Sequence, residues 1–473
     1  MATIEQEFPE LELDIAMSDA SPAAAQPIDP RAMRRRVIGL AWPVIGENFL
    51  ETLLGVIDTV LVAGLGTAAI AGVGTALQVM FLLISALSAL AVGSAVLVAQ
   101  AVGAGDTARA GRLARQSLVW SVIISIPLAL GGLLFSAPII GAFGVEPDVA
   151  RIGTDYMHVT MGTVVVLVAL FIGSGALRGA GDSRTPMVVT AIANVINVGL
   201  AYALIYGHFG LPALGAVGSA WATFIARALA LGLLVRALWR GSNGVSIRSG
   251  SPEEAARAWR PDLGVARQVL RIGVPAALEQ VLVSSAFLAL SVVVAHLGTA
   301  VLAAHRIAFN ALSLAFLPGI GFAIATTALV GQSVGARRPA EGAAAARVAT
   351  NWAVIWMSAI AALLFIFAPQ VLHLFTNDAG VVAAGASGLR VVALTQPFWA
   401  VLFVQAGALR GLGNTGFPLK VTGTGIWLSV ALAFLLVQTF GGGLATVWAA
   451  FLVFGPINAG LMWWRFRRAV AAA

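Results

Sequence analysis

Long apolar segments follow one another along almost the whole chain, and they limit its fold more than any other feature. About 20 apolar residues in a helix cross the hydrocarbon core of a bilayer. Segments of that length, separated by glycine, proline and charged residues, lie near 37–64, 76–101, 116–137, 157–177, 187–206, 213–238, 270–296, 301–330, 349–368, 388–409, 418–438 and 443–464. Only 10% of the 473 residues are charged, whereas soluble domains carry about 25%. We therefore predict an all-α polytopic membrane protein with twelve transmembrane helices.

The basic residues support this number of helices and predict their orientation. Of the 28 Lys and Arg residues, 24 lie in the N-terminal tail, the even-numbered loops or the C-terminal tail. Basic loop residues favour the cytoplasmic side of a membrane. We therefore expect a multi-pass protein of the plasma (inner) membrane with both termini and the polar 240–262 loop in the cytoplasm. Because these residues form no dense patch, the net charge of +7 does not indicate a nucleic-acid partner.

Several classes of site and of protein are excluded by composition and motifs. The segment 1–30 holds seven acids, no Lys or Arg and no apolar core, which is typical of a disordered tail rather than of a cleavable signal peptide. The absence of cysteine excludes disulfides and thiolate sites. No GxxxxGKS/T or HExxH motif occurs, and the five His residues are scattered. We therefore expect neither an enzyme nor a metal site, and no cofactor beyond a coupling ion.

The two halves of the chain repeat one another at a constant offset, the one that separates Pro43 from Pro275. The same offset matches Gln100 with Gln332, LGTA at 65–68 with LGTA at 297–300, and GALRGAGDSRTPM at 175–187 with GALRGLGNTGFPL at 407–419. Each half carries six predicted spans, an even number, so both halves enter the membrane in the same orientation. We therefore expect two six-helix lobes related by a pseudo-two-fold axis along the membrane normal, with a cavity between them.

This repeat divides the chain into four predicted regions. They are an acidic tail at 1–33, an N-lobe at 34–239, a cytoplasmic linker at 240–268 and a C-lobe at 269–473. Two rocking halves are typical of a secondary transporter, although a channel or a scaffold would also fit a duplication. No ring of charges or carbonyl filter indicates a channel. The two lobes complete the fold within one chain, so we expect a monomer.

Four acidic residues lie inside predicted spans, and three of them are on the first. Glu47, Glu51 and Asp58 are spaced i, i+4 and i+11, which places them within about 40° of one another around a helix and over about 16 Å of its length. Charged groups in a bilayer are costly and usually mark ion or proton pathways. We predict that these carboxylates couple transport to a cation, with an ion pair to Arg227 as the alternative. In the second half, Glu279 forms either a second polar site with Arg306 or a simple ion pair with it.

Polar residues on later spans lie at a similar depth. Asn194 and Asn197 belong to the fifth span, and Thr223 belongs to the sixth. Counted from the outer ends of their spans, Asp58, Asn197 and Thr223 lie roughly 9 to 15 Å deep. Their carboxylate, amide and hydroxyl oxygens could bind Na⁺ or form a proton relay. The alternatives are that Thr bonds its own backbone and that Asn bridges two helices.

Several motifs together resemble the multidrug and toxic compound extrusion (MATE) family. They are WPVIGENFLETLLGVIDTVLVAGLGTAAIAGVG at 42–74, GSGALRGAGDSRTP at 173–186, VGQSVGA at 330–336 and GALRGLGNTGFP at 407–418. The resemblance runs from about 35 to 465. With AAHRIAFN at 303–310 and the first-helix Asp, the chain is most similar to the DinF-type branch. The resemblance implies twelve helices in two lobes and cation-coupled export of drugs or metabolites.

The resemblance also implies roles for individual residues. In this branch an acid on the first helix belongs to the coupling site, and Asp58 matches it. Asn197 matches the Asn of the family's NxxxD pattern, but Ala201 replaces the Asp and so removes one carboxylate from a Na⁺ site. Thr223 matches a sixth-helix Thr. Other branches couple through an acid on the seventh helix, and that position is Val283 here.

We therefore predict an antiporter that exports organic, cationic and amphipathic drugs or metabolites in exchange for H⁺ or Na⁺ by alternating access. Pro43 lacks an N–H and is the expected bend point of the first helix. Small-molecule substrates and the lipid bilayer are the expected partners. Two alternatives share the same helical build: a flippase of lipid-linked precursors, which would need a strongly cationic cavity, and a transporter of organic anions or metabolites.

Overall fold

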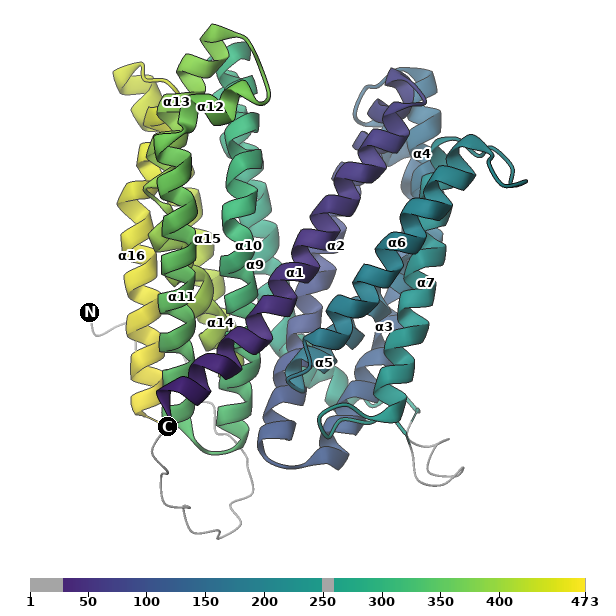
Figure 1. The fold of residues 1–473 in the computed structure, drawn as a ribbon, viewed down its shortest axis with the longest axis vertical. Helices are drawn as coiled ribbons and strands as arrows, with labels where there is room; N and C mark the ends of the chain where they lie inside the picture. Colours follow the sequence, from purple (N-terminus) through teal and green to yellow (C-terminus); the bar gives the residue numbers. More distant parts are fainter. Residues whose placement is uncertain (1–28, 249–258, 473) are drawn as a thin grey trace.

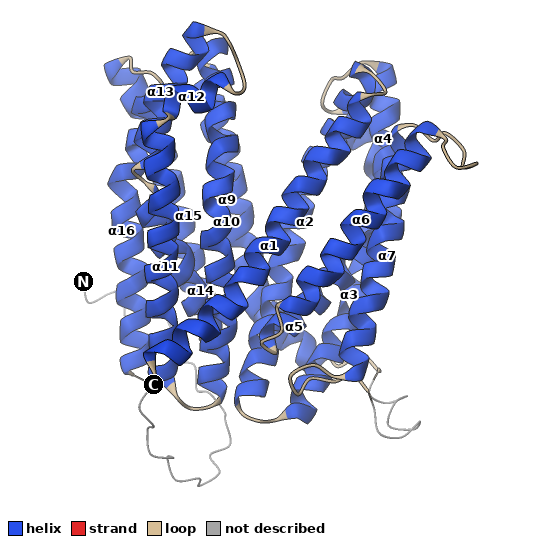
Figure 2. Cartoon of the chain, viewed as in Figure 1, coloured by secondary structure: helices blue, strands red, loops and turns tan. Residues whose placement is uncertain are grey.

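The computed structural model describes residues 29–248 and 259–472, and within these ranges it is helical throughout, with no β-strand (Figures 1 and 2). The predicted acidic tail therefore lies outside the described residues except at its end, as does the middle of the predicted linker. The first half holds α1 (Pro30–Ala63), α2 (Thr67–Gly103), α3 (Thr107–Gly141), α4 (Pro147–Gly162), α5 (Val164–Gly179), α6 (Arg184–Tyr206) and α7 (Ala216–Arg240). The second half holds α9 (Leu263–Ala295), α10 (Thr299–Gly335), α11 (Pro339–Ile366), α12 (Ala368–His373), α13 (Ala379–Ala393), α14 (Gln396–Gly411), α15 (Gly416–Phe440) and α16 (Leu444–Ala471).

These helices account for the predicted membrane spans. Among the described residues, eight helices are long and apolar enough to cross a membrane, or ten if two bent pairs each count as one span. The pair α4 and α5 bends by 51°, and the pair α13 and α14 bends by 47°. The breaks fall at Thr163 and Thr395, which occupy matching positions of the internal repeat. With α1 and α2, which are 34 and 37 residues long, the helices form the twelve spans that the apolar segments predict.

The helices form two lobes that meet at one end of the molecule and diverge towards the other (Figure 1). One lobe contains α2 to α7, and the other contains α10 to α16. At the end where the lobes meet, α2 packs against α9 and α10. This is the duplicated six-helix architecture that the sequence repeat predicts.

The first helix of each half begins in the core of the opposite lobe. In α1, Met33, Val37 and Leu40 belong to the apolar core of the C-terminal lobe. In α9, Val265 and Ile272 belong to a core of the N-terminal lobe. Each helix then crosses to its own lobe, and Figure 1 shows the diagonal course of α1 between the two. The two lobes are therefore joined by two exchanged helix ends as well as by their contact surface.

Pro43 lies where α1 passes from one lobe to the other. Before it, Ala41 belongs to the core of the C-terminal lobe. After it, the side chains and carbonyls of α1 bond to the N-terminal lobe, as Asn194 Nδ2 does to the carbonyl oxygen of Leu50 at 2.8 Å. A proline inside a helix removes one main-chain hydrogen bond and favours a bend. The predicted bend point thus stands at the boundary between two packing environments.

Aspartates fix the starts of several helices. Asp106, Asp262 and Asp378 precede α3, α9 and α13, and each accepts hydrogen bonds from main-chain N–H groups of the first turn. Such caps satisfy donors that a helix cannot satisfy itself. Because these acids serve as caps near the membrane surfaces, they leave the acids inside the spans as the candidates for chemistry.

Candidate functional site

A cavity of about 350 Å³ lies inside the N-terminal lobe, enclosed by α1, α2, α4, α5, α6 and α7. Its wall is largely apolar, with Val73, Met80 and Phe171 among the lining residues. Ligand sites of this kind combine an apolar wall with a few polar groups that fix orientation. The polar groups that bear on its chemistry are Glu51, Asp58, Tyr156, Asn194, Asn197, Ser219, Thr223 and Arg227.

Two of the three predicted carboxylates on α1 face this cavity. Glu51 is exposed to it, and Asp58 is half-buried in its wall. The Oδ1 atom of Asp58 is buried and has no hydrogen-bond partner among the described residues. A buried polar atom without a partner is costly, so it is a position where a proton, an ion or a water molecule would be stabilised.

The third carboxylate, Glu47, is buried and lies outside the residues that line the cavity. Arg178 at the end of α5 donates a hydrogen bond from Nη2 to Glu47 Oε1 at 2.6 Å. Thr190 on α6 also lies 3.5 Å from the same oxygen. Because a buried carboxylate paired with a guanidinium is already compensated, the structure sets Glu47 apart from Glu51 and Asp58. The alternative for these acids, an ion pair with Arg227, does not form among the described residues.

The C-terminal lobe holds the same ion pair at the repeat positions. Arg410 Nη2 donates to Glu279 Oε2 at 2.8 Å, and Glu279 is buried. The predicted partner of Glu279 was Arg306, and this is wrong: Arg306 is exposed on α10. The correct partner could have been found from the repeat, because the Arg of both GALRG motifs lies 131 residues after the Glu. Hydropathy instead placed this Arg in a loop.

Two of the polar residues of the later spans bond to each other and bridge two helices, which is the role given above as the alternative for Asn. Asn197 Nδ2 donates to Thr223 Oγ1 at 3.0 Å, and both residues are buried in the wall of the cavity. The Oδ1 atom of Asn197 has no partner among the described residues. Ala201, which replaces the family's Asp, is fully buried and offers no ligand. Asn197 therefore presents one unused oxygen beside the cavity.

Two further residues line the cavity: Tyr156, which was not predicted, and Arg227, which was considered only as an ion-pair partner of the acids on α1. Tyr156 on α4 is buried in the wall, although it precedes the predicted fourth span by one residue. Arg227 on α7 also lines the cavity. Among the described residues, Arg227 forms no hydrogen bond and no ion pair within 4.0 Å. The cavity therefore contains two carboxylates and one guanidinium that do not touch.

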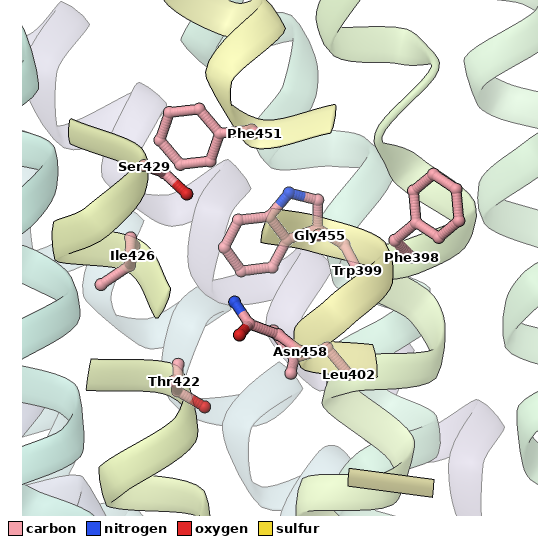
Figure 3. Close-up of a pocket in the computed structure, with 9 residues that line it drawn as sticks. All are labelled: Phe398, Trp399, Leu402, Thr422, Ile426, Ser429, Phe451, Gly455 and Asn458. Carbon is pink, nitrogen blue, oxygen red and sulfur yellow. The ribbon is translucent and has the colours of Figure 1, made fainter. Parts of the chain in front are cut away.

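The C-terminal lobe offers a much smaller space. A pocket of about 20 Å³ lies between α14, α15 and α16, lined by Trp399, Thr422, Phe451 and Asn458 among others (Figure 3). No ionisable side chain lines it. A space of this size holds about one water molecule. This pocket is therefore no counterpart of the cavity in the N-terminal lobe, whose wall holds two carboxylates and a guanidinium.

The described residues contain no group of three or more His, Cys, Asp or Glu side chains that could hold a metal ion. An alkali cation needs no such group, because carboxylate, amide and hydroxyl oxygens are its ligands. The free oxygens of Asp58 and Asn197 are of this kind. The site thus has the groups for proton transfer or for a weakly held hard cation.

Comparisons with known proteins agree with this architecture. The MatE family model matches twice, at residues 43–203 and 275–435, and the two matches are separated by the offset of the internal repeat. A probable multidrug resistance protein NorM of Thermotoga maritima is 30% identical over 88% of both chains. A multidrug resistance protein NorM of Burkholderia vietnamiensis is 31% identical over 90% of this chain and 92% of its own. The multidrug resistance protein PmpM of Pseudomonas aeruginosa is 30% identical over 84% and 82%.

Solved structures show the same fold. A crystal structure of MATE in complex with MaL6 superposes with a TM-score of 0.85 at 24% identity, over 93% of this chain and 97% of that one. An outward-facing conformation of a multidrug resistance MATE family transporter gives 0.84 at 23% identity, over 95% and 99%. A MOP superfamily transporter from Pyrococcus furiosus, described as having a binding pocket of reverse polarity, also gives a TM-score of 0.84 at 23% identity, over 95% of this chain and 99% of that one.

Proposed function

The chain belongs to the multidrug and toxic compound extrusion (MATE) family, and from this premise we propose that it exports amphipathic organic cations, drugs or metabolites, in exchange for H⁺ or Na⁺. Membrane transport and multidrug efflux are what the family and the named relatives share. The coupling ion and the class of substrate are the proposal, and they rest on the cavity of the N-terminal lobe.

One observation carries the proposal: Glu51 and Asp58 are the acidic side chains in a largely apolar cavity. An apolar wall binds the body of an amphipathic molecule, and a carboxylate in a low-dielectric site attracts its cationic group. Protonation of the same carboxylate removes that attraction. Substrate and proton therefore compete for one site, which is the basic requirement of an antiporter.

The coupling step is proposed to act through α1. Asp58 lies in the part of α1 that follows Pro43, and this part packs on the N-terminal lobe. The first turns of α1 pack in the core of the C-terminal lobe. A change in the charge of Asp58 alters how the second part of α1 packs, and the bend at Pro43 transmits this change to the contact between the lobes.

H⁺ is favoured over Na⁺ as the coupling ion. A tight Na⁺ site needs several oxygen ligands, and the buried Ala201, which stands where the resemblance places an Asp, supplies none. A proton needs only the carboxylate of Asp58 or Glu51. Both termini and the basic loops are proposed to lie in the cytoplasm. The lobes meet at that end, so the cavity is proposed to face outward.

The test is dye efflux from proteoliposomes with the pH gradient and the Na⁺ gradient imposed separately. We expect a pH gradient to drive ethidium efflux, and Asp58→Asn to reduce it to the level of empty liposomes. Asp148→Asn is the matched control, because Asp148 is an exposed acid in the first turn of α4. Efflux that follows only the Na⁺ gradient would overturn the proton assignment, and no efflux of any organic cation would overturn the proposed substrate class.

The alternatives make distinct predictions for the same cavity. A flippase of lipid-linked pyrophosphates would need several cationic groups, and Arg227 is the one basic residue among those that line this cavity. Export of an organic anion is the second candidate, and Arg227 is the observation in its favour. Replacement of ethidium by an anionic dye in the same proteoliposomes distinguishes the two substrate classes.

A further inference from the structure

Arg227 is a half-buried charge for which the coupling scheme above gives no role. It lies on α7, one turn after Thr223, and lines the cavity with the two carboxylates. A guanidinium without a bonded partner is costly inside a membrane even when it is only partly buried. The charges of Glu51 and Asp58 act on it across the cavity, yet neither carboxylate lies within 4.0 Å of it.

This lobe contains one acid–arginine pair that is bonded and one group of acids and an arginine that is not. The two differ in whether their charged groups are free to bind a ligand. Glu47 and Arg178 are bonded at 2.6 Å, so each neutralises the other. Arg227, Glu51 and Asp58 share one cavity without such a bond. The space between them remains available to a ligand, and the balance of charge in that space depends on the protonation of the acids.

Arg227 changes the net charge of the cavity in every protonation state of Glu51 and Asp58. With both carboxylates ionised, the three groups sum to −1; with one protonated they sum to zero, and with both protonated to +1. Without Arg227 the same states would be −2, −1 and zero. The other titratable lining group is Tyr156 of α4, which is neutral. The described residues of α2 and α5 that line the cavity are uncharged, as are Asn194 and Asn197 of α6.

We propose that Arg227 is the residue that expels the cationic substrate, because its guanidinium turns the cavity cationic once Glu51 and Asp58 have taken up protons. This inference rests on the proposed function and adds a second part to it. In a cavity that held the two acids without Arg227, protonation would end the attraction of the cationic substrate but would not repel it. With Arg227 present, protonation leaves a like charge beside the substrate cation, and in a low-dielectric cavity that repulsion is strong. Arg227 is thus a specificity-determining residue that rejects cations in the protonated state.

The test compares two probes of nearly the same shape and opposite charge, tetraphenylphosphonium and tetraphenylborate. Their dissociation constants are measured on the purified full chain at about pH 8 and about pH 5, on either side of the range in which carboxyl groups in apolar surroundings titrate. For the wild type we expect the cation to bind more tightly at the higher pH. At the lower pH the preference inverts, so that the anion binds more tightly by about tenfold. This measurement needs no variant.

Variants then assign the inversion to Arg227. In Arg227→Gln we expect the cation to bind at low pH about as well as the anion, so the inversion is lost. Arg227→Lys keeps the positive charge and the inversion. Arg151→Gln is the matched control, because Arg151 is an exposed residue of α4 outside the cavity.

The possible outcomes test the role of Arg227 and the proposed substrate class separately. A wild type that still prefers the cation at low pH, or an Arg227→Gln variant that inverts as the wild type does, overturns the role of Arg227 and leaves the proposed cation export intact. A wild type that prefers the anion at both pH values overturns the proposed substrate class, and with it the expulsion of cations. Inversion in the wild type and in Arg227→Lys, with its loss in Arg227→Gln, supports both.

Discussion

Gln332 of α10 donates a hydrogen bond from Nε2 to the main-chain carbonyl oxygen of Gly179 at the end of α5, at 3.0 Å, and thereby joins the two lobes. The repeat supplies the reciprocal bond, from Gln100 Nε2 of α2 to the carbonyl oxygen of Gly411 at the end of α14, at 3.2 Å. The donors of the two bonds occupy matching repeat positions, and so do the acceptors. Arg36 adds a bond of 2.7 Å to Gln332 Oε1. These bonds lie where the lobes meet, so they stabilise the conformation described above.

The first prediction concerns this pair of glutamines. Gln332→Ala should shift the conformational equilibrium towards the state in which this end is open, because each net hydrogen bond contributes about 1 kcal/mol, or about a fivefold change in population. Gln100→Ala should have the smaller effect, since no described residue bonds to Gln100 as Arg36 bonds to Gln332. Distances between spin labels at Glu146→Cys and Asn377→Cys, one on each lobe, would measure the shift, and the cysteine-free chain makes such labelling specific.

A label distance that stays the same in Gln332→Ala and Gln100→Ala would contradict this prediction. Thr424→Ala is a suitable control, because the bonds of Thr424 to described residues stay within α15 and go to the carbonyl oxygens of Lys420 and Val421. The Thr424→Ala substitution removes a hydrogen bond within α15 without changing the contact between the lobes.

The second prediction separates structure from coupling among the carboxylates of α1. Glu47→Gln leaves Arg178 buried without its counter-charge, and breaking a buried ion pair by one side costs about 3 to 5 kcal/mol. We therefore expect a clear fall in the thermal unfolding temperature. Asp58→Asn removes no hydrogen bond among the described residues, so its unfolding temperature should stay near that of the wild type while transport is lost.

The double variant Glu47→Gln with Arg178→Met tests the same idea from the other side. It removes both charges, so it should recover much of the stability that Glu47→Gln loses. If Glu47→Gln instead unfolds at the wild-type temperature and abolishes coupling, then Glu47 belongs to the coupling site as the sequence analysis predicts.

The third prediction concerns the bend of α1. Pro43→Ala restores an N–H to the middle of the helix and so favours a straight course. Transport should fall severalfold, while the unfolding temperature should stay the same or rise. Pro275→Ala makes the matching change in α9 of the other half, where the pocket of about 20 Å³ has no ionisable lining residue, and should affect transport less. Equal losses in the two variants would show that the bend serves both lobes alike.

The fourth prediction concerns stability and pH at the turn between α5 and α6. Burial alone would raise the pKa of Asp182, but hydrogen bonds from Ser242, Thr185 and the Arg184 N–H outweigh it and hold this pKa below its usual range. A carboxyl with a lowered pKa contributes stability above its unfolded pKa and loses that contribution as the pH falls through the folded one. Asp182→Asn should therefore lower the unfolding temperature at neutral pH.

The difference between Asp182→Asn and the wild type should shrink as the pH falls into the acid range. Thermal unfolding of both proteins over a series of pH values measures it. A difference that is constant with pH would mean that the carboxylate charge of Asp182 has no part in the stability of this turn.

Much of the fold could be predicted from the sequence, because apolar length and the internal repeat report directly on spans and on duplication. Asp58, Asn197 and Thr223 could be placed in one site, since depth along a helix follows from residue count. The partners of Glu47 and Glu279 were missed because hydropathy placed Arg178 and Arg410 in loops, whereas both lie in the last turns of helices. That α1 begins in the opposite lobe could not be foreseen, because an apolar pattern reports burial and not the identity of the neighbour.

The exchanged beginnings of α1 and α9 give the molecule the character of a domain-swapped dimer fused into one chain. Each half lends its first turns to the core of the other, so neither half contains all of its own interior. Chains cut within the 240–262 loop should therefore reassemble when produced together, and each should be poorly folded when produced alone. A protein built in this way cannot lose or tilt one half without disturbing the interior of the other, and its two halves constrain one another's evolution.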